Sequence, residues 1–247
     1  MCIAALAWQA HPRWKLVALA NRDEFHARPA APLERWTDVP GLIAGRDLQS
    51  GGTWLGVRES STDAARFVLV TNHRAEGFPQ PDRPSRGALV TNLLQGANPL
   101  AVLLANYNPF NLFSADTDGL WLLTNHPEQR VVLGAGLYGL SNGPFLPPWP
   151  KTRALAAALS GWLETGATAP EPLLAALADE TLPPTIPGES GPESPFSATF
   201  IRSPLYGTRC STLVMIDHHG AGTMIERRFD PTGAPSGGSR HEFRWGG

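Results

Sequence analysis

The fold is decided by the N-terminal run Cys2-Ile3-Ala4-Ala5-Leu6-Ala7-Trp8 and by Lys15-Leu16-Val17-Ala18-Leu19-Ala20, which follows a His-Pro-Arg turn. Two short apolar runs on either side of a proline-containing turn are typical of a β-hairpin. The first strand then begins at Cys2, and the second runs into four polar residues, Asn21-Arg22-Asp23-Glu24. If the strands pair, these polar side chains lie near Cys2.

Outward from this hairpin, the apolar pattern changes between strand-like and helix-like periods. Strands are expected at 53–57, 67–71, 110–115, 120–124, 211–217 and 223–229. Apolar residues three to four apart predict helices at 85–95 (with Ser85 as N-cap), 99–105, 152–163 and 172–182. This order predicts mainly antiparallel strands in two central sheets, sandwiched between helical layers.

The same pattern predicts one domain over residues 1–230. Residues 182–197 contain five prolines and are expected to form an exposed loop. The segment 231–247 is rich in Gly and Ser and is expected to be a flexible, poorly ordered C-terminal tail.

Composition excludes several classes of protein. The 247 residues carry a formal net charge of −2 and show no basic run, which argues against nucleic-acid binding. The apolar N-terminus is too short for a signal peptide or a spanning helix, so we expect a cytoplasmic protein without an integral membrane segment. Two cysteines form no secreted disulfide framework, and the seven histidines show no metal-binding motif. Oligomeric state stays open.

Cys2 is the candidate nucleophile because of its position. Removal of Met1 would give Cys2 a free α-amino group, whose ordinary pKa of about 7.7–8.0 suits it to accept the thiol proton. The alternative is a small buried strand residue. Arg22 and the neighbouring carboxylates could lower the thiol pKa, hold the amine and orient a polar substrate. The alternative for that segment is a solvated turn with a salt bridge.

A glycine pair introduces a third candidate region, Gly51-Gly52-Thr53-Trp54-Leu55-Gly56. Two glycines ahead of a strand permit a close backbone approach to a ligand or to another segment. The region is not a phosphate loop, because it has no Gly-Lys-Ser/Thr sequence. A tight strand entry and a pocket wall, with Trp54 as a stacking surface, remain equal alternatives.

Several motifs occur in an order that resembles the NRDE family, which includes the eukaryotic transport-and-Golgi-organisation proteins. The resemblance covers residues 1 to about 229. It is carried by Met1-Cys2-Ile3, Asn21-Arg22-Asp23-Glu24-Phe25, Arg28-Pro29, Gly45-Arg46-Asp47, Gly51 to Gly56, Thr71-Asn72-His73-Arg74, Ser85-Arg86-Gly87, Tyr138-Gly139-Leu140-Ser141-Asn142, Pro148-Trp149-Pro150-Lys151 and Tyr206-Gly207-Thr208-Arg209. A bacterial type of sequence is expected.

The family is in turn similar to the N-terminal-nucleophile hydrolases of the bile-salt-hydrolase and penicillin-acylase type. That resemblance implies an α+β fold, a four-layer αββα sandwich of two mainly antiparallel sheets. It also implies that Cys2 attacks a carbonyl while Asp23 or Arg22 positions the α-amine. Asn142 would be the oxyanion donor, with Asn72 as a weaker second one.

Arg209 resembles the late Arg of those hydrolases. The sequence departs from their Arg-Asn-X-Asp motif, because here the order is Asn-Arg-Asp-Glu, from Asn21 to Glu24. The functional carboxylate is therefore either Asp23 or Glu24.

Two functions follow from the resemblance. The first is an N-terminal-cysteine amidohydrolase acting on a small linear or acylated amide, with substrate contacts from Asn21, Glu24, Arg46, Trp54, Asn72 and Arg74. The alternative is a non-catalytic haem or acyl-lipid binding or trafficking protein that uses the same cleft. Its ligand's anionic groups would then meet Arg22, Arg46, Arg74 and Arg209. No resident cofactor is expected, and haem enters only as a candidate ligand.

Overall fold

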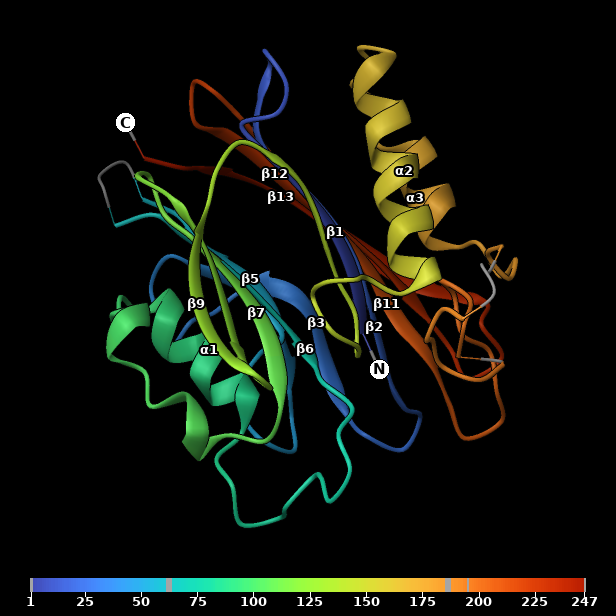
Figure 1. Ribbon diagram of the computed structural model, residues 1–247. Coiled ribbons are helices and arrows are strands. Elements are labelled where there is room, and N and C mark those ends of the chain that lie inside the picture. The colour runs from blue at the N-terminus through green and yellow to red at the C-terminus, as the bar shows by residue number, and fades with distance from the viewer. Residues whose placement is uncertain (1, 61–63, 185–187, 195, 247) are drawn as a thin grey trace.

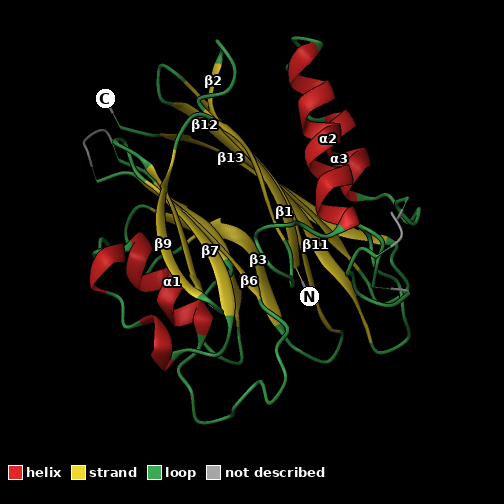
Figure 2. Ribbon diagram, in the orientation of Figure 1, coloured by secondary structure: helices red, strands yellow, loops and turns green. Residues whose placement is uncertain are grey.

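Two antiparallel sheets pack face to face in the computed structural model, which describes residues 2–60, 64–184, 188–194 and 196–246. Helices α2 (Pro150–Glu164) and α3 (Glu171–Leu177) cover the outer face of one sheet, and α1 (Arg86–Leu94) covers the other (Figure 1). The predicted α+β sandwich of two antiparallel sheets is confirmed. Its layers run helix, sheet, sheet, helix (Figure 2).

The first sheet carries the N-terminal hairpin at its centre. Its strand order is β10-β1-β2-β11-β12-β13. The bounds of these strands are Gly136–Leu140, Cys2–Trp8, Trp14–Phe25, Tyr206–Asp217, Ala221–Phe229 and Pro235–Arg244. Pairing of Cys2 with Arg22 and of Trp8 with Leu16 confirms the predicted hairpin.

The second sheet follows the chain order, β3-β4-β5-β6-β7-β8-β9. Its strands span Ala30–Arg35, Leu42–Asp47, Leu55–Arg58, Arg66–Asn72, Phe110–Ala115, Leu120–Asn125 and Glu128–Leu133. Two 3-10 turns, Pro99–Ala101 and Leu104–Asn106, lie between α1 and β7. They replace the single helix expected at 99–105.

Strand alternation in β1 and β2 determines which side chains reach the site. Ala4, Leu6, Ala18 and Ala20 face the second sheet and join the central core, whereas Ile3, Ala5, Val17 and Leu19 face the helices. Successive strand residues point to opposite faces. Cys2 and Arg22 therefore point between the sheets, and Asn21 and Asp23 point toward the helical layer.

The Asn21-to-Glu24 segment is not a solvated turn. β2 continues to Phe25, and Asn21, Arg22 and Asp23 are all buried. Pairing with β11 on the far side of the strand removes these residues from solvent. The expected salt bridge nevertheless forms, between Arg22 and Asp47.

The expectation of a poorly ordered C-terminal tail is wrong. Residues 235–244 form β13, which pairs along the whole of β12 and buries Phe243 and Trp245. Backbone hydrogen bonds, to which Gly and Ser contribute as well as any residue, hold this strand in place. The expected last helix also ends early, because α3 stops at Leu177. Part of the proline-rich loop at 182–197 lies outside the described residues.

Candidate active site

A cavity of about 420 Å³ opens at the end of the sandwich where β1 begins. Cys2 lines it from β1, Arg22 and Asp23 line it from β2, and Trp54 and Arg86 come from the segments around α1. Burial leaves only 8% of Cys2 exposed. The nucleophile predicted from the sequence thus lies at the start of a strand and lines a cleft.

The pKa of the Cys2 thiol is subject to opposing influences. Burial is the largest and raises its pKa, and the negative charge of Asp23 adds to that. A hydrogen bond from the backbone N–H of Asp23 and the guanidinium of Arg22 act in the other direction. The net effect is a raised pKa of Cys2, which the Asp23 N–H and Arg22 limit but do not reverse.

Asp23 faces the helical layer and lies in a polar cluster beneath Cys2. Its Oδ1 accepts a hydrogen bond from Thr208 Oγ1 at 2.7 Å. Burial raises the pKa of Asp23 from 3.8 to about 6, and the charge of Lys151 and the Thr208 bond limit that rise. Lys151 is only 1% exposed, at the start of α2, and its Nζ donates to the carbonyl of Phe196 at 2.9 Å. Burial lowers the pKa of Lys151, whereas Asp23 raises it.

Asp47 holds two arginines of the cavity together. Its Oδ2 accepts from Arg22 Nη2 at 3.1 Å and from Arg28 Nε at 2.6 Å. Its Oδ1 accepts from the backbone N–H groups of Gln49 and Ser50. Burial opposes ionisation of Asp47, but these hydrogen bonds outweigh it and lower its pKa. One carboxylate therefore serves two guanidinium groups.

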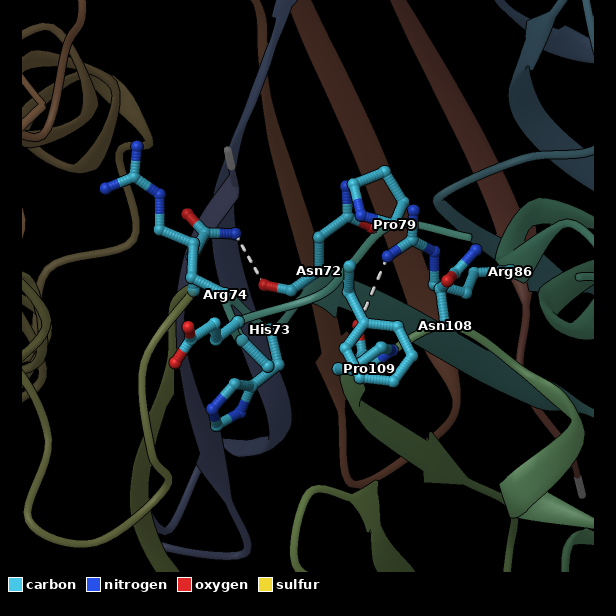
Figure 3. A pocket seen from close by; sticks show the side chains of 11 residues that line it. Asn72, His73, Arg74, Pro79, Arg86, Asn108 and Pro109 are labelled. Atoms are coloured by element: carbon cyan, nitrogen blue, oxygen red, sulfur yellow. Dashed lines mark hydrogen bonds between the residues drawn. The ribbon is translucent and has the colours of Figure 1, made fainter. Parts of the chain in front are cut away.

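A second cavity of about 510 Å³ adjoins the first (Figure 3). Both cavities are lined by Asn72, Pro79, Arg86 and Asn108. The second one adds the apolar residues Ala75, Phe78 and Pro109 and the polar residues His73, Arg74, Glu76 and Asn142. The two cavities thus form neighbouring lobes of one cleft, and Arg86 lies at their junction.

The structure places Asn142 in the second lobe, not beside Cys2. Asn142 is fully buried, and its Nδ2 donates to the backbone carbonyl of Asn72 at 2.6 Å. Asn72 itself is exposed and lines both lobes. The amide expected to be the weaker oxyanion donor is therefore the one in the cavity of Cys2.

The remaining predicted contact residues divide into two groups. Glu24 and Trp54 line the Cys2 lobe, and Arg74 lines the second lobe. Asn21, Arg46 and Arg209 line neither.

All three of these excluded residues hold the fold together instead. Asn21 is buried against the helical layer, where its Nδ2 donates to the carbonyls of Leu177 and Thr199. Arg46 pairs with Asp38 and stacks over Trp36. Arg209 donates to the carbonyls of Phe25 and His26.

The glycine pair ahead of β5 is explained by packing against a helix. A Cβ atom on Gly52 would lie 2.3 Å from the backbone carbon of Gly87 at the start of α1. Thr53 N–H also donates to the Gly87 carbonyl at 3.3 Å. The close approach is thus to α1, and it places both Trp54 and Arg86 in the wall of the cavity.

Sequence reasoning did not assign a role to Arg28, Asp47, Arg86 or Lys151. All four lie in segments that carry the family resemblance, at 28–29, 45–47, 85–87 and 148–151. The family resemblance therefore marks these four segments, but nothing in the local sequence indicates that they meet at Cys2.

Within the described part of the chain, no group of three or more His, Cys, Asp or Glu side chains could hold a metal ion. No described helix has the length and apolar character needed to cross a membrane.

Comparison with known proteins gives a consistent result over the whole fold. The sequence model of the family "Transport and Golgi organisation 2" matches residues 1–231. The Transport and Golgi organization protein 2 homolog of Bos taurus is 30% identical over 99% of both chains, and that of Homo sapiens is 30% identical over 92% of both. The Drosophila melanogaster protein is 31% identical over 44% of this chain and 39% of its own length. These relatives are animal proteins and lend no support to a bacterial type of sequence.

Proposed function

The chain belongs to the Transport and Golgi organisation 2 family, and we propose that it hydrolyses a small linear or acylated amide with Cys2 as the nucleophile. One observation carries the proposal. Cys2 begins a central strand and lines a cleft in which a backbone N–H and a guanidinium group limit the rise in thiol pKa that burial causes. Nucleophilic cysteines require such partly accessible, electropositive surroundings.

The proposed reaction has two balanced steps. After removal of Met1, the α-amino group of Cys2 accepts the thiol proton, and the sulfur attacks the amide carbonyl to form a C–S bond. The C–N bond breaks as the ammonium returns its proton to the leaving amine. Water then hydrolyses the thioester, which releases a carboxylic acid and restores the thiol. Asp23 orients the α-amino group through its charge.

Asn72 is the oxyanion donor in this proposal. Its side chain lines the cavity of Cys2, whereas the Asn142 amide is already committed to the Asn72 carbonyl. Asn142 thus acts as a positioning residue that fixes the backbone of Asn72. Loss of an oxyanion donor typically costs about 3 kcal/mol in the transition state.

The test combines intact mass with turnover. The untagged protein is weighed to establish whether Met1 is absent, and is then incubated with a panel of short N-acyl amides and p-nitroanilides. We expect turnover and a thioester-linked acyl adduct that hydroxylamine removes, with both lost in Cys2→Ala. Cys210→Ala is the matched control, because Cys210 is equally buried but lines neither lobe. Retained Met1, or turnover that survives Cys2→Ala, would rule out this mechanism.

A second function is favoured by the apolar lobe. Phe78, Pro79 and Pro109 offer an apolar surface next to the arginines, which suits non-catalytic binding or trafficking of haem or an acyl lipid. A haem iron would have Cys2 available in one lobe and His73 in the other, so both residues are candidate ligands. A carrier retains its ligand in Asn72→Ala and shows no turnover, whereas a hydrolase loses turnover in that variant.

A further inference from the structure

The cavity of Cys2 holds an excess of positive charge that its own carboxylates do not neutralise. Its lining includes four arginines and three acidic residues, namely Arg22, Arg28, Arg83, Arg86, Asp23, Glu24 and Asp47. Arg83 is occupied by Gln80 and by the carbonyls of Ala105 and Tyr107. Arg22 and Arg28 share the carboxylate of Asp47, and Arg28 also forms an ion pair with Glu24 at 3.8 Å.

Arg22 lines the cavity and has one unused donor. The residue is 7% exposed, and its Nη1 is buried without a hydrogen-bond partner among the described residues. Buried donors in folded proteins are nearly always satisfied, and each exception calls for an explanation such as an ordered water, an ion or a bound group. The only described ion pair of Arg22 is made by its other nitrogen, Nη2.

Arg86 also has unused hydrogen-bonding capacity in the cleft. It forms no ion pair within the described ranges, and its one hydrogen bond there runs from Nη1 to the Pro109 carbonyl at 3.1 Å (Figure 3). Burial lowers the pKa of Arg86 and the charge of Arg28 adds to that, whereas the charge of Glu24 acts in the other direction. Its position at the junction lets it meet a ligand in either lobe.

We propose that Arg22 Nη1 and Arg86 together bind a carboxylate group of the substrate beside Cys2, at a site called here the carboxylate subsite. The inference deepens the proposed hydrolase function and rests on it for its substrate class. That class is an amide whose acyl or amine portion carries a carboxylate a few bonds from the scissile carbonyl. The planar fork of a guanidinium matches a carboxylate, and charge-assisted hydrogen bonds of this kind are about twice as strong as neutral ones.

Two alkylating reagents test the subsite without any knowledge of the natural substrate. Iodoacetate carries a carboxylate and iodoacetamide carries a neutral amide, and both transfer a CH₂ group to the Cys2 thiolate as iodide leaves. We expect the ratio of the iodoacetate rate to the iodoacetamide rate to be at least about tenfold higher at Cys2 than at the thiol of a short peptide. The ratio cancels the intrinsic reactivity of the thiolate, so it reports the carboxylate alone.

Variants assign the effect to these residues. Arg86→Gln should lower the ratio about tenfold, and Arg86→Lys should lower it less because the charge is kept. Arg240→Gln is the matched control, since Arg240 is an exposed arginine on β13 paired with Glu242. In the wild type, added salt should also lower the ratio, because the interaction is ionic.

The outcomes separate the subsite from the hydrolase. A ratio equal to that of the peptide, unchanged by salt and by Arg86→Gln, overturns the carboxylate subsite even if Cys2 is reactive. Slow reaction with both reagents together with an elevated ratio supports the subsite and counts against the nucleophile. If Arg86→Gln does not fold, the salt dependence and Arg86→Lys still decide the matter.

Discussion

The two cysteines occupy closely similar positions in the sheet but differ in their access to the cleft and in the groups that set their pKa values. Cys2 on β1 and Cys210 on β11 both pair with Arg22 of β2, so one guanidinium-bearing strand residue lies between them. Both thiols are buried and point between the two sheets. Cys2, however, lies at the start of its strand and lines the cleft, whereas Cys210 lies within β11.

Charge separates the two thiols further. Burial raises the pKa of both, but the carboxylate of Glu226 raises the pKa of Cys210 again, to well above its usual range. Arg22 lowers the pKa of both thiols and a carboxylate raises each, but at Cys2 the backbone N–H of Asp23 also opposes burial. The comparison teaches that burial alone does not distinguish a structural cysteine from a reactive one. Access to a cavity and the balance of nearby charges and hydrogen bonds do.

The largest expected effect is the difference in alkylation between these two thiols. In the native protein at about pH 7.5, iodoacetamide should modify Cys2 about a thousandfold faster than Cys210. The reason is that Cys210 reacts only when the sheets open locally. Peptide mapping of the adducts over time measures both rates. Comparable rates at the two positions would remove the distinction on which the candidate active site rests.

The polar cluster beneath Cys2 should affect stability as a function of pH. Asp23 has an ordinary pKa of 3.8 and a folded-state pKa of about 6, so the folded protein binds the proton more tightly than the unfolded chain. Its contribution is fully present below pH 3.8 and is lost as the pH rises through 6, by about 3 kcal/mol. Asp23→Asn should remove this slope in urea unfolding between those pH values. An unchanged slope in the variant would assign it to other groups.

Lys151 should adjust the reactivity of Cys2 through charge alone. Its ammonium group favours the ionised forms of Asp23 and Cys2, so its removal should raise the pKa of both groups. We expect Lys151→Gln, which can still donate to the Phe196 carbonyl, to move the pH profile of Cys2 alkylation upward by about one unit and to slow the reaction about tenfold at neutral pH.

Lys151→Met, which loses that hydrogen bond as well, serves as the matched comparison. It should shift the pH profile of alkylation as far as Lys151→Gln does, but with a larger loss of stability. If the role of Lys151 is only structural, both variants will lower the melting temperature and leave the pH profile in place.

The sequence predicts those features of the site that depend on strands adjacent in the chain. The N-terminal hairpin is a local structure with a clear apolar pattern, so the proximity of Cys2 to Arg22 follows from the sequence alone. The two outer layers of helices follow in the same way from apolar spacing. β13 does not, because Pro235-Ser236-Gly237-Gly238-Ser239 has no apolar pattern and is held by backbone pairing.

The remainder of the site depends on contacts that no local pattern records. Asp47 and Arg86 reach the cavity of Cys2 because the second sheet, which carries α1 on its outer face, packs against the first. Lys151 reaches Asp23 from the start of α2. Asn142 was expected beside Cys2, yet it supports Asn72 from the adjoining lobe. Family resemblance identified the segments but not the geometry among them.

The smallest expected effect tests whether access or charge protects Cys210. Glu226 is buried, with its pKa raised by burial, and it accepts a hydrogen bond from the Leu33 backbone at 2.9 Å. Glu226→Gln keeps an oxygen for that bond and removes the charge that raises the pKa of Cys210. If the packing of the sheets is what protects this thiol, its alkylation rate should change by less than about threefold, measured by the same peptide mapping. A large increase would show instead that the carboxylate suppresses Cys210, and that the two thiols differ mainly in the charge beside them.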